Sequence, residues 1–129
     1  MLDARELQKI FVHVGRTLND GGLFQFDLNT DYFLRWVATS EKLFPVRDSY
    51  CMAYHEYDRR RHVATFHHLW FVKMGRLYER REVTVQERAF ETADLRRMLK
   101  KAGLRLVSTR VQRRLEGMPI RMLYLARKG

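Results

Sequence analysis

Histidine side chains offer the most direct chemistry in this chain, because a neutral imidazole can take a proton from an amine or a hydroxyl group near pH 7. His55, His62, His67 and His68 all fall in one stretch with strand-like alternation. Neighbouring strand residues point to opposite faces, so His67 and His68 cannot serve one site. We expect His68 to act as the proton acceptor. A structural histidine packed among aromatic side chains is the alternative.

Three further side chains are predicted to line a small-molecule pocket with His68. Trp70 follows it on the same face, and His55 and Tyr57 would lie across a hairpin. No carboxylate or cysteine stands at a metal-ligand spacing from these histidines, so no metal site is expected.

A second polar group ends the apolar stretch of residues 23–28. Asp27, Asn29 and Thr30 lie where a strand in an open α/β sheet would meet its ligand crevice, and Tyr32 is close enough to line it. We therefore expect these four residues to bind substrate. The alternatives are that Asn29 and Thr30 cap the next helix and that Tyr32 is a core residue beside Trp36.

Composition restricts the partners and the compartment. The formal charge is +10, from 25 basic and 15 acidic residues, which favours anionic partners. The basic residues are spread along the chain rather than gathered in one block, so nucleic-acid binding is possible but not favoured. The single cysteine, Cys51, is expected to be buried and inert and fits a reducing cytoplasm. Neither a signal peptide nor a membrane-spanning segment is expected.

The expected elements form an α/β protein of one domain, residues 1–129. Apolar spacing predicts a helix over 4–18, which Asp3 begins and Gly21-Gly22 follows. A strand over 23–28 and a short helix over 31–39 come next, and residues 40–45 are expected to be a connection. Residues 46–90 then predict an antiparallel insertion of three strands, at 50–57, 62–73 and 77–90. A helix capped by Thr92 and strands at 104–111 and 120–126 complete the chain.

Two segments resemble class I S-adenosylmethionine-dependent methyltransferases. The first runs from Leu7 through Gly21-Gly22 into Leu23-Phe24-Gln25-Phe26-Asp27-Leu28-Asn29-Thr30, and is similar to the helix and fifth strand of that family. The second is Glu91-Thr92-Ala93-Asp94-Leu95 with Ala102-Gly103-Leu104, which resembles the last helix and its exit. The resemblance implies a partial Rossmann-like methyltransferase sheet with the insertion shaping the acceptor pocket, S-adenosylmethionine as cofactor, and a small-molecule acceptor.

The half of the family fold that grips the cofactor has no counterpart here. Its glycine-rich turn would need a G-x-G, and none of the seven glycines forms one. The strand at 23–28 would then be an exposed edge, which predicts pairing either with a second copy in a homodimer or with a missing N-terminal half. Two other functions stay open: a non-catalytic homodimeric binding module with the same fold, and a basic RNA- or nucleotide-binding protein.

Overall fold

The computed structural model describes residues 3–129, which form two compact units. One unit comprises residues 34–88, and the other comprises residues 3–33 with residues 89–129. The first is inserted into the sequence of the second, which fits the predicted insertion, although it begins earlier than residue 46. The expectation that residues 1–129 behave as a single domain stays a prediction.

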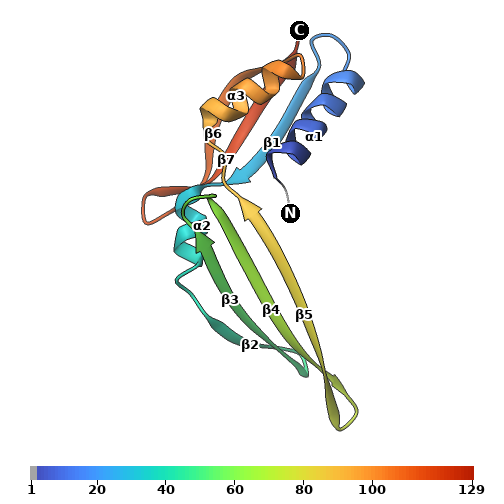
Figure 1. Ribbon diagram of the computed structural model, residues 1–129, viewed down its shortest axis with the longest axis vertical. Coiled ribbons are helices and arrows are strands. Elements are labelled where there is room, and N and C mark those ends of the chain that lie inside the picture. Colours follow the sequence, from blue (N-terminus) through green and yellow to red (C-terminus); the bar gives the residue numbers. More distant parts are fainter. Residues whose placement is uncertain (1–2) are drawn as a thin grey trace. The chain divides into compact units, whose positions relative to one another are not determined.

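The helix-containing unit is built on a three-stranded antiparallel sheet with the order β1-β7-β6 (Figure 1). The three predicted strands are therefore confirmed as members of one layer. The strands are β1 (Leu23–Asn29), β6 (Leu104–Leu115) and β7 (Met118–Lys128), and the helices are α1 (Ala4–Thr17) and α3 (Thr92–Lys101). The short helix α2 (Asp31–Val37) follows β1.

The core of this unit lies between the two helices and one face of the sheet. Phe11 of α1 and Leu95 and Leu99 of α3 have no exposed surface, and they pack with Tyr124 and Ala126 of β7. Alternation along β1 turns Phe24 and Phe26 toward the same core, where the Phe11 and Phe26 ring centroids are 5.2 Å apart. The sheet is thus amphipathic in the way that its period-two pattern predicts.

The ends of α1 follow from its sequence. Asp3 and Glu6 form the predicted capping box, in which each side chain accepts a hydrogen bond from the backbone N–H of the other residue. After the helix, Gly21 has a φ of +79°, a conformation that glycine adopts without strain. The Gly21 N–H donates to the Lys128 carbonyl at 2.8 Å, so this turn ties the start of β1 to the end of β7.

Helix α3 corrects one local prediction. Its N-cap is Glu91, which makes no capping bond with its side chain, and Thr92 is already the first helical residue. The Thr92 side chain instead shares a hydrogen bond with the buried Tyr124. The Thr92 hydroxyl, which was predicted to cap α3, therefore bonds to a side chain that is remote in sequence.

Strand β1 is an edge strand, as the sequence predicted. It pairs with β7 in unbroken register from Leu23–Arg127 to Asn29–Arg121, and within residues 3–129 no strand pairs with its other side. Strand β6, the opposite edge, has three irregularities in its register with β7. Bulges protect an edge from further pairing, so the regular edge of this sheet is β1.

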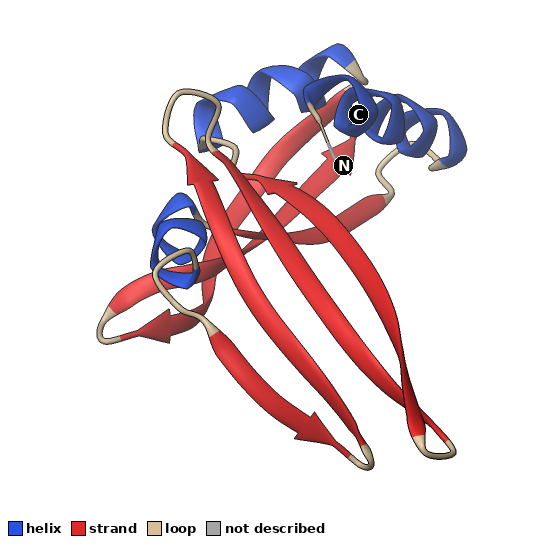
Figure 2. Cartoon of the chain, turned by 60° about the horizontal axis from the view of Figure 1, so that its bottom comes forward, coloured by secondary structure: helices blue, strands red, loops and turns tan. Residues whose placement is uncertain are grey.

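The inserted unit is a four-stranded antiparallel meander with the order β2-β3-β4-β5 (Figure 2). Its strands are β2 (Lys42–Val46), β3 (Ser49–Asp58), β4 (Val63–Met74) and β5 (Leu77–Arg88). The three predicted strands are confirmed. The prediction of a connection over 40–45 was wrong, because most of these residues belong to β2. Pro45 is compatible with that strand because β2 lies at the edge of the sheet.

Candidate functional site

Strand register places the four residues predicted for the pocket on one face of the inserted sheet. His55 is opposite Phe66 and Tyr57 is opposite Ala64, while Ala53 is opposite His68. Residues at alternating positions of β4 share a face, and paired residues of neighbouring strands point the same way. We call this the histidine face, and His67 points to the other side.

His55 and His68 lie together at the centre of the histidine face. Their ring centroids are 6.3 Å apart at an interplanar angle of 85°, and His55 packs edge-to-face on Phe66 at 4.9 Å. The Nδ1 atom of His55 is 3.1 Å from the Ser40 carbonyl oxygen. Because a carbonyl can only accept, Nδ1 carries the proton, and Nε2 of a neutral His55 ring is left as an acceptor. His55, predicted only to bind, therefore has the geometry of a proton acceptor as well.

Trp70 and Tyr57 lie on either side of this pair, far from each other. Trp70 makes an edge-to-face contact with Phe44, with centroids 6.4 Å apart, toward one end of the sheet. The Tyr57 hydroxyl lies 3.2 Å from His62 Nδ1 near the other end. Ala64, which is opposite Tyr57, and Trp70 are six residue steps apart along β4, or about 20 Å. The four predicted residues therefore share a face without forming one compact pocket.

The polar group at the end of β1 is engaged in structural contacts. The Thr30 hydroxyl donates to the Pro119 carbonyl at 2.8 Å and accepts from the Phe33 N–H at 3.2 Å, so Thr30 caps α2 as the alternative interpretation predicted. Asp27 forms an ion pair with Arg121, with Oδ2 and Nε 3.0 Å apart. That buried Nε is close enough for an ion pair but is not directed at the oxygen as a hydrogen bond requires.

The remaining two residues of this group differ in placement. Asn29 is the last residue of β1, opposite Arg121, and Tyr32 lies half-buried in the first turn of α2. The structure thus keeps all four residues near the carboxyl end of β1. Their roles in substrate binding stay predictions.

The face opposite the histidine face carries a polar cluster that sequence reasoning missed. His67 stacks on Tyr54 with centroids 4.5 Å apart, and its Nε2 lies 3.1 Å from Glu56 Oε2. Thr84 Oγ1 is 3.5 Å from His67 Nδ1. The cavity beside them measures only about 80 Å³, which has room for water but not for an organic substrate. Strand register would have found this cluster, because Tyr54 and Thr84 both pair with His67.

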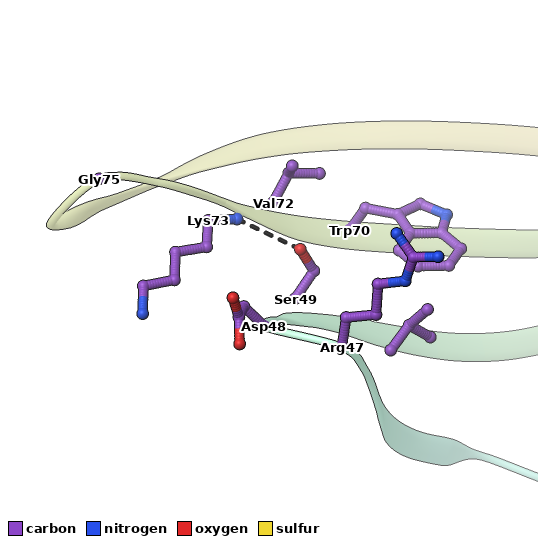
Figure 3. Close-up of a pocket in the computed structure, with 8 residues that line it drawn as sticks. Arg47, Asp48, Ser49, Trp70, Val72, Lys73 and Gly75 are labelled. Atoms are coloured by element: carbon purple, nitrogen blue, oxygen red, sulfur yellow. Dashed lines mark hydrogen bonds between the residues drawn. The ribbon is translucent and has the colours of Figure 1, made fainter.

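A larger depression, which we call the tip groove, lies where the sheet ends in the β2–β3 and β4–β5 turns (Figure 3). Its volume is about 760 Å³. Gly75 of the β4–β5 turn lines it, together with apolar and charged residues from β2, the β2–β3 turn and β4, namely Val46, Arg47, Asp48, Trp70, Val72 and Lys73. No sequence pattern indicates this groove, because the two turns are separated by about 25 residues of chain.

Cys51 is fully buried in β3, as predicted, and it is a free thiol. Burial raises its pKa, which keeps the thiol protonated and unreactive near neutral pH. In the part of the chain that the structure describes, no group of three or more histidine, cysteine, aspartate or glutamate side chains is arranged to hold a metal ion. None of the described helices is long and apolar enough to cross a bilayer.

The glycines of the described residues do not form the kind of cradle that holds a nucleoside cofactor such as S-adenosylmethionine. Backbone that approaches such a ligand closely uses glycine where a Cβ would collide with it. Here a Cβ on Gly15 would meet the Ala102 carbonyl oxygen, and one on Gly22 would meet Asn19 and Leu18. The space beside Gly15 and Gly22 is occupied by atoms of the protein itself. Positive φ values in turns account for four other glycines, Gly21, Gly75, Gly103 and Gly117.

Comparison with known proteins identifies the fold. No protein-family model and no curated protein matches the chain. Among solved structures, an S-adenosylmethionine-dependent methyltransferase from Clostridium acetobutylicum ATCC 824 aligns with a TM-score of 0.79 and 23% identity over 98% of this chain. The CcbJ methyltransferase from Streptomyces caelestis aligns with a TM-score of 0.72 and 20% identity over the whole chain.

A third structure extends this likeness to a protein with bound cofactor. CalS10, an amino pentose methyltransferase from Micromonospora echinaspora involved in calicheamicin biosynthesis, was solved with S-adenosylmethionine bound and aligns with a TM-score of 0.60 and 11% identity. This chain spans 52%, 56% and 53% of the three structures, respectively. It therefore has part of a class I methyltransferase fold, about half of it by length.

Proposed function

We propose that this chain supplies the acceptor side of a small-molecule methyltransferase that uses S-adenosylmethionine. The observation that carries the proposal is the fold match, which includes nearly all of this chain but only about half of each methyltransferase. Since the described residues do not form a cofactor cradle, the cofactor would be held by protein outside them. The donor supplies an electrophilic methyl group, and the protein's task is to orient the acceptor.

On this proposal, the histidine face receives the acceptor and its proton. An amine or hydroxyl acceptor loses a proton as it gains a methyl group, and a neutral imidazole can take that proton. His68 is proposed as the base. His55, oriented by the Ser40 carbonyl, lies beside it and has Nε2 as a second acceptor. The mixed aromatic and polar character of this face suits a small organic acceptor.

The β1 edge is proposed as the attachment point for the cofactor-binding half. No strand among residues 3–129 pairs with its side away from β7, and Phe24 and Phe26 are only half-buried beside that edge. An added strand would satisfy the backbone and cover the aromatic side chains. We also propose a cytoplasmic location, because a free thiol in the core suits a reducing compartment.

Titration calorimetry with S-adenosylhomocysteine tests this function. We expect no saturable heat with the 129-residue chain alone. A polypeptide that joins this chain to the segment encoded immediately upstream should bind with a dissociation constant in the range of about 1–100 μM, typical of enzyme ligands. A joined polypeptide without binding, or an upstream segment without a glycine-rich strand–turn–helix, would contradict the proposal.

The regular β1 edge also supports a second candidate, a non-catalytic homodimeric binding module. In a symmetric dimer, β1 would pair with its own copy about a two-fold axis. Sedimentation of the chain alone distinguishes the candidates when it is combined with the calorimetry. A dimer that binds no S-adenosylhomocysteine in any context favours the module, whereas cofactor binding by the joined polypeptide favours the enzyme.

A further inference from the structure

The tip groove combines an apolar wall with positive charge. Trp70 and Val72 of β4 provide the wall, and Arg47 comes from the β2–β3 turn. Figure 3 shows the Arg47 side chain extending toward the Trp70 indole, while Lys73 lies nearer the β4–β5 turn. The Ser49 hydroxyl accepts the Lys73 backbone N–H at 3.3 Å, which holds the first residue of β3 against β4 beneath the groove.

The two cations of the groove differ from the basic residues on the neighbouring strand. Arg80 pairs with Glu82 at 2.7 Å, and Arg81 pairs with Glu79 at 3.1 Å, so the charges on β5 are locally neutralised. Among residues 3–129, neither Arg47 nor Lys73 makes an ion pair. Asp48 also lines the groove, which leaves one net positive charge among its three charged side chains. The groove therefore favours an anion.

The backbone at Arg47 is constrained in an uncommon conformation. Its φ is +56°, in a turn where glycine or asparagine is usual. His62 and Glu116, in two other turns of the chain, have similar φ values of +54° and +51°, so this conformation belongs to the turn and fixes where the Arg47 side chain begins. A planar guanidinium held beside an indole is suited to a carboxylate, because it can donate two parallel hydrogen bonds.

We propose that the tip groove binds a small organic anion, with a flat apolar body against Trp70 and Val72 and a carboxylate on Arg47. The volume of this open groove, about 760 Å³, leaves room for such a molecule. The proposal goes beyond the methyl-transfer function. It concerns the end of the inserted sheet with the β2–β3 and β4–β5 turns rather than the His55–His68 pair, and it requires no cofactor.

Nitrogen-proton correlation spectra of the 129-residue chain test this site with 2-naphthoate as the probe. The indole N–H signal of Trp70, assigned by its loss in Trp70→Phe, and the amide signals of Arg47 and Lys73 should shift and saturate. The neutral analogue 2-naphthalenemethanol lacks the carboxylate and should bind at least about tenfold more weakly.

Matched variants then identify the charged side chain that binds the carboxylate. Arg47→Gln should weaken naphthoate binding at least about tenfold, whereas Arg60→Gln, in the turn at the other end of the same sheet, should change it less than about twofold. If Arg47→Gln misfolds, the comparison of 2-naphthoate with its neutral analogue on the unmodified chain decides the matter. The site would be refuted by the absence of saturable shifts, equal affinity for the neutral analogue, or an equal effect of Arg60→Gln.

Discussion

At the scale of single residues, the two adjacent histidines of β4 provide a matched pair for testing the proposed base. In the joined, active polypeptide, we expect His68→Asn to lower kcat about 10²–10⁴-fold, the usual contribution of a positioned proton acceptor. KM should change much less, because the step that is lost is proton transfer rather than binding. Steady-state methylation rates measure both quantities.

His67→Asn is the control for that measurement. His67 has the same chemistry one residue away, but it points to the opposite face and contacts Glu56 and Tyr54. We expect it to change kcat by less than about threefold, because it is no part of the proposed acceptor site. If both variants lost activity equally, the effect would be structural and the role of His68 would be wrong.

Gly15 is the residue where steric exclusion gives the clearest stability prediction. A Cβ at this position would lie 2.2 Å from the Ala102 carbonyl oxygen. Alanine in a helix interior is ordinarily more stable than glycine by about 0.5–1 kcal/mol. Here we expect Gly15→Ala to lower the free energy of unfolding by about 1–3 kcal/mol, because α1 must move away from the end of α3.

Urea unfolding followed by circular dichroism measures this change. Lys9→Ala, on the exposed face of the same helix, should stay within about 0.5 kcal/mol of the natural chain. A stabilised Gly15→Ala variant would show that the two helices do not approach as closely as described.

Residue types alone predicted only part of the candidate site. Alternation placed His55, Tyr57, His68 and Trp70 on one face, because side-chain direction in a strand depends only on parity. Their positions along the hairpin depend on register, and register separated Tyr57 from Trp70. The tip groove was beyond prediction, because it forms from two turns that are remote in sequence.

At the scale of elements, the two edges of the three-stranded sheet should respond differently to added charge. Gln25 is exposed in the middle of β1, and lysine on a regular edge disfavours pairing with another strand. If the chain self-associates through β1, Gln25→Lys should raise the dimer dissociation constant at least about tenfold, a loss near 1.4 kcal/mol. Sedimentation velocity across a concentration series measures this.

Gln112→Lys adds the same charge to β6, at a point where the register with β7 is already irregular. We expect it to leave association within about twofold of the natural chain, because a bulged edge is a poor template for pairing. Equal effects of the two variants would assign the association to net charge rather than to the β1 edge.

Element types followed closely from sequence, while boundaries and pairing did not. The helix at 4–17 was predictable because Asp3, Glu6 and the apolar spacing agree. The strand β2 was missed because Pro45 and the short segment around it favoured a connection. Its strand conformation depends on a partner, since each residue from Lys42 to Val46 pairs with β3. The strand propensity of five residues does not indicate whether a partner strand is present.

At the scale of the whole molecule, stability should fall in alkaline solution. Burial raises the pKa of Tyr124, while its hydrogen bond with Thr92 acts in the opposite direction and is the smaller effect. The folded state therefore holds the phenolic proton more tightly than the unfolded state does. The stabilisation is complete below the unfolded pKa of about 10 and is lost as the pH rises through the folded value.

We expect the free energy of unfolding to decrease between about pH 9 and pH 11. Burial also raises the pKa of the Cys51 thiol, so ionisation of this group lowers the free energy of unfolding in the same direction. Its effect begins at a lower pH, because a thiol ionises at a lower pH than a phenol does. Urea unfolding of the natural chain and of Tyr124→Phe at several pH values separates the two groups. A variant with an undiminished alkaline decrease would show that Tyr124 is not responsible.

The charge of +10 is distributed over both units. Residues 34–88 include 11 basic and 7 acidic side chains, a net charge of +4. The remaining residues include 14 basic and 8 acidic side chains, a net charge of +6. Several arginines are engaged in ion pairs, including Arg97 with Asp94 and Arg121 with Asp27. The alternative of RNA binding predicts that affinity falls steeply and linearly with salt on a logarithmic scale.

Filter-binding with generic RNA between 50 and 200 mM salt tests that alternative. We expect only weak association at the lower concentration, because the basic residues are spread along the chain and several are in ion pairs. Retention of tight binding at the higher concentration would favour the RNA-binding function over the proposed enzyme.

The sole cysteine gives the molecule a built-in probe of its own fluctuations. Cys51 lies in β3 between Phe44 and Trp70 of the adjoining strands and has no exposed surface. A thiol-specific reagent can reach it only in conformers where the meander has come apart locally. The mass-spectrometric time course of modification would therefore record how often the inserted sheet opens, while amide exchange in β7 would follow the other sheet in the same sample.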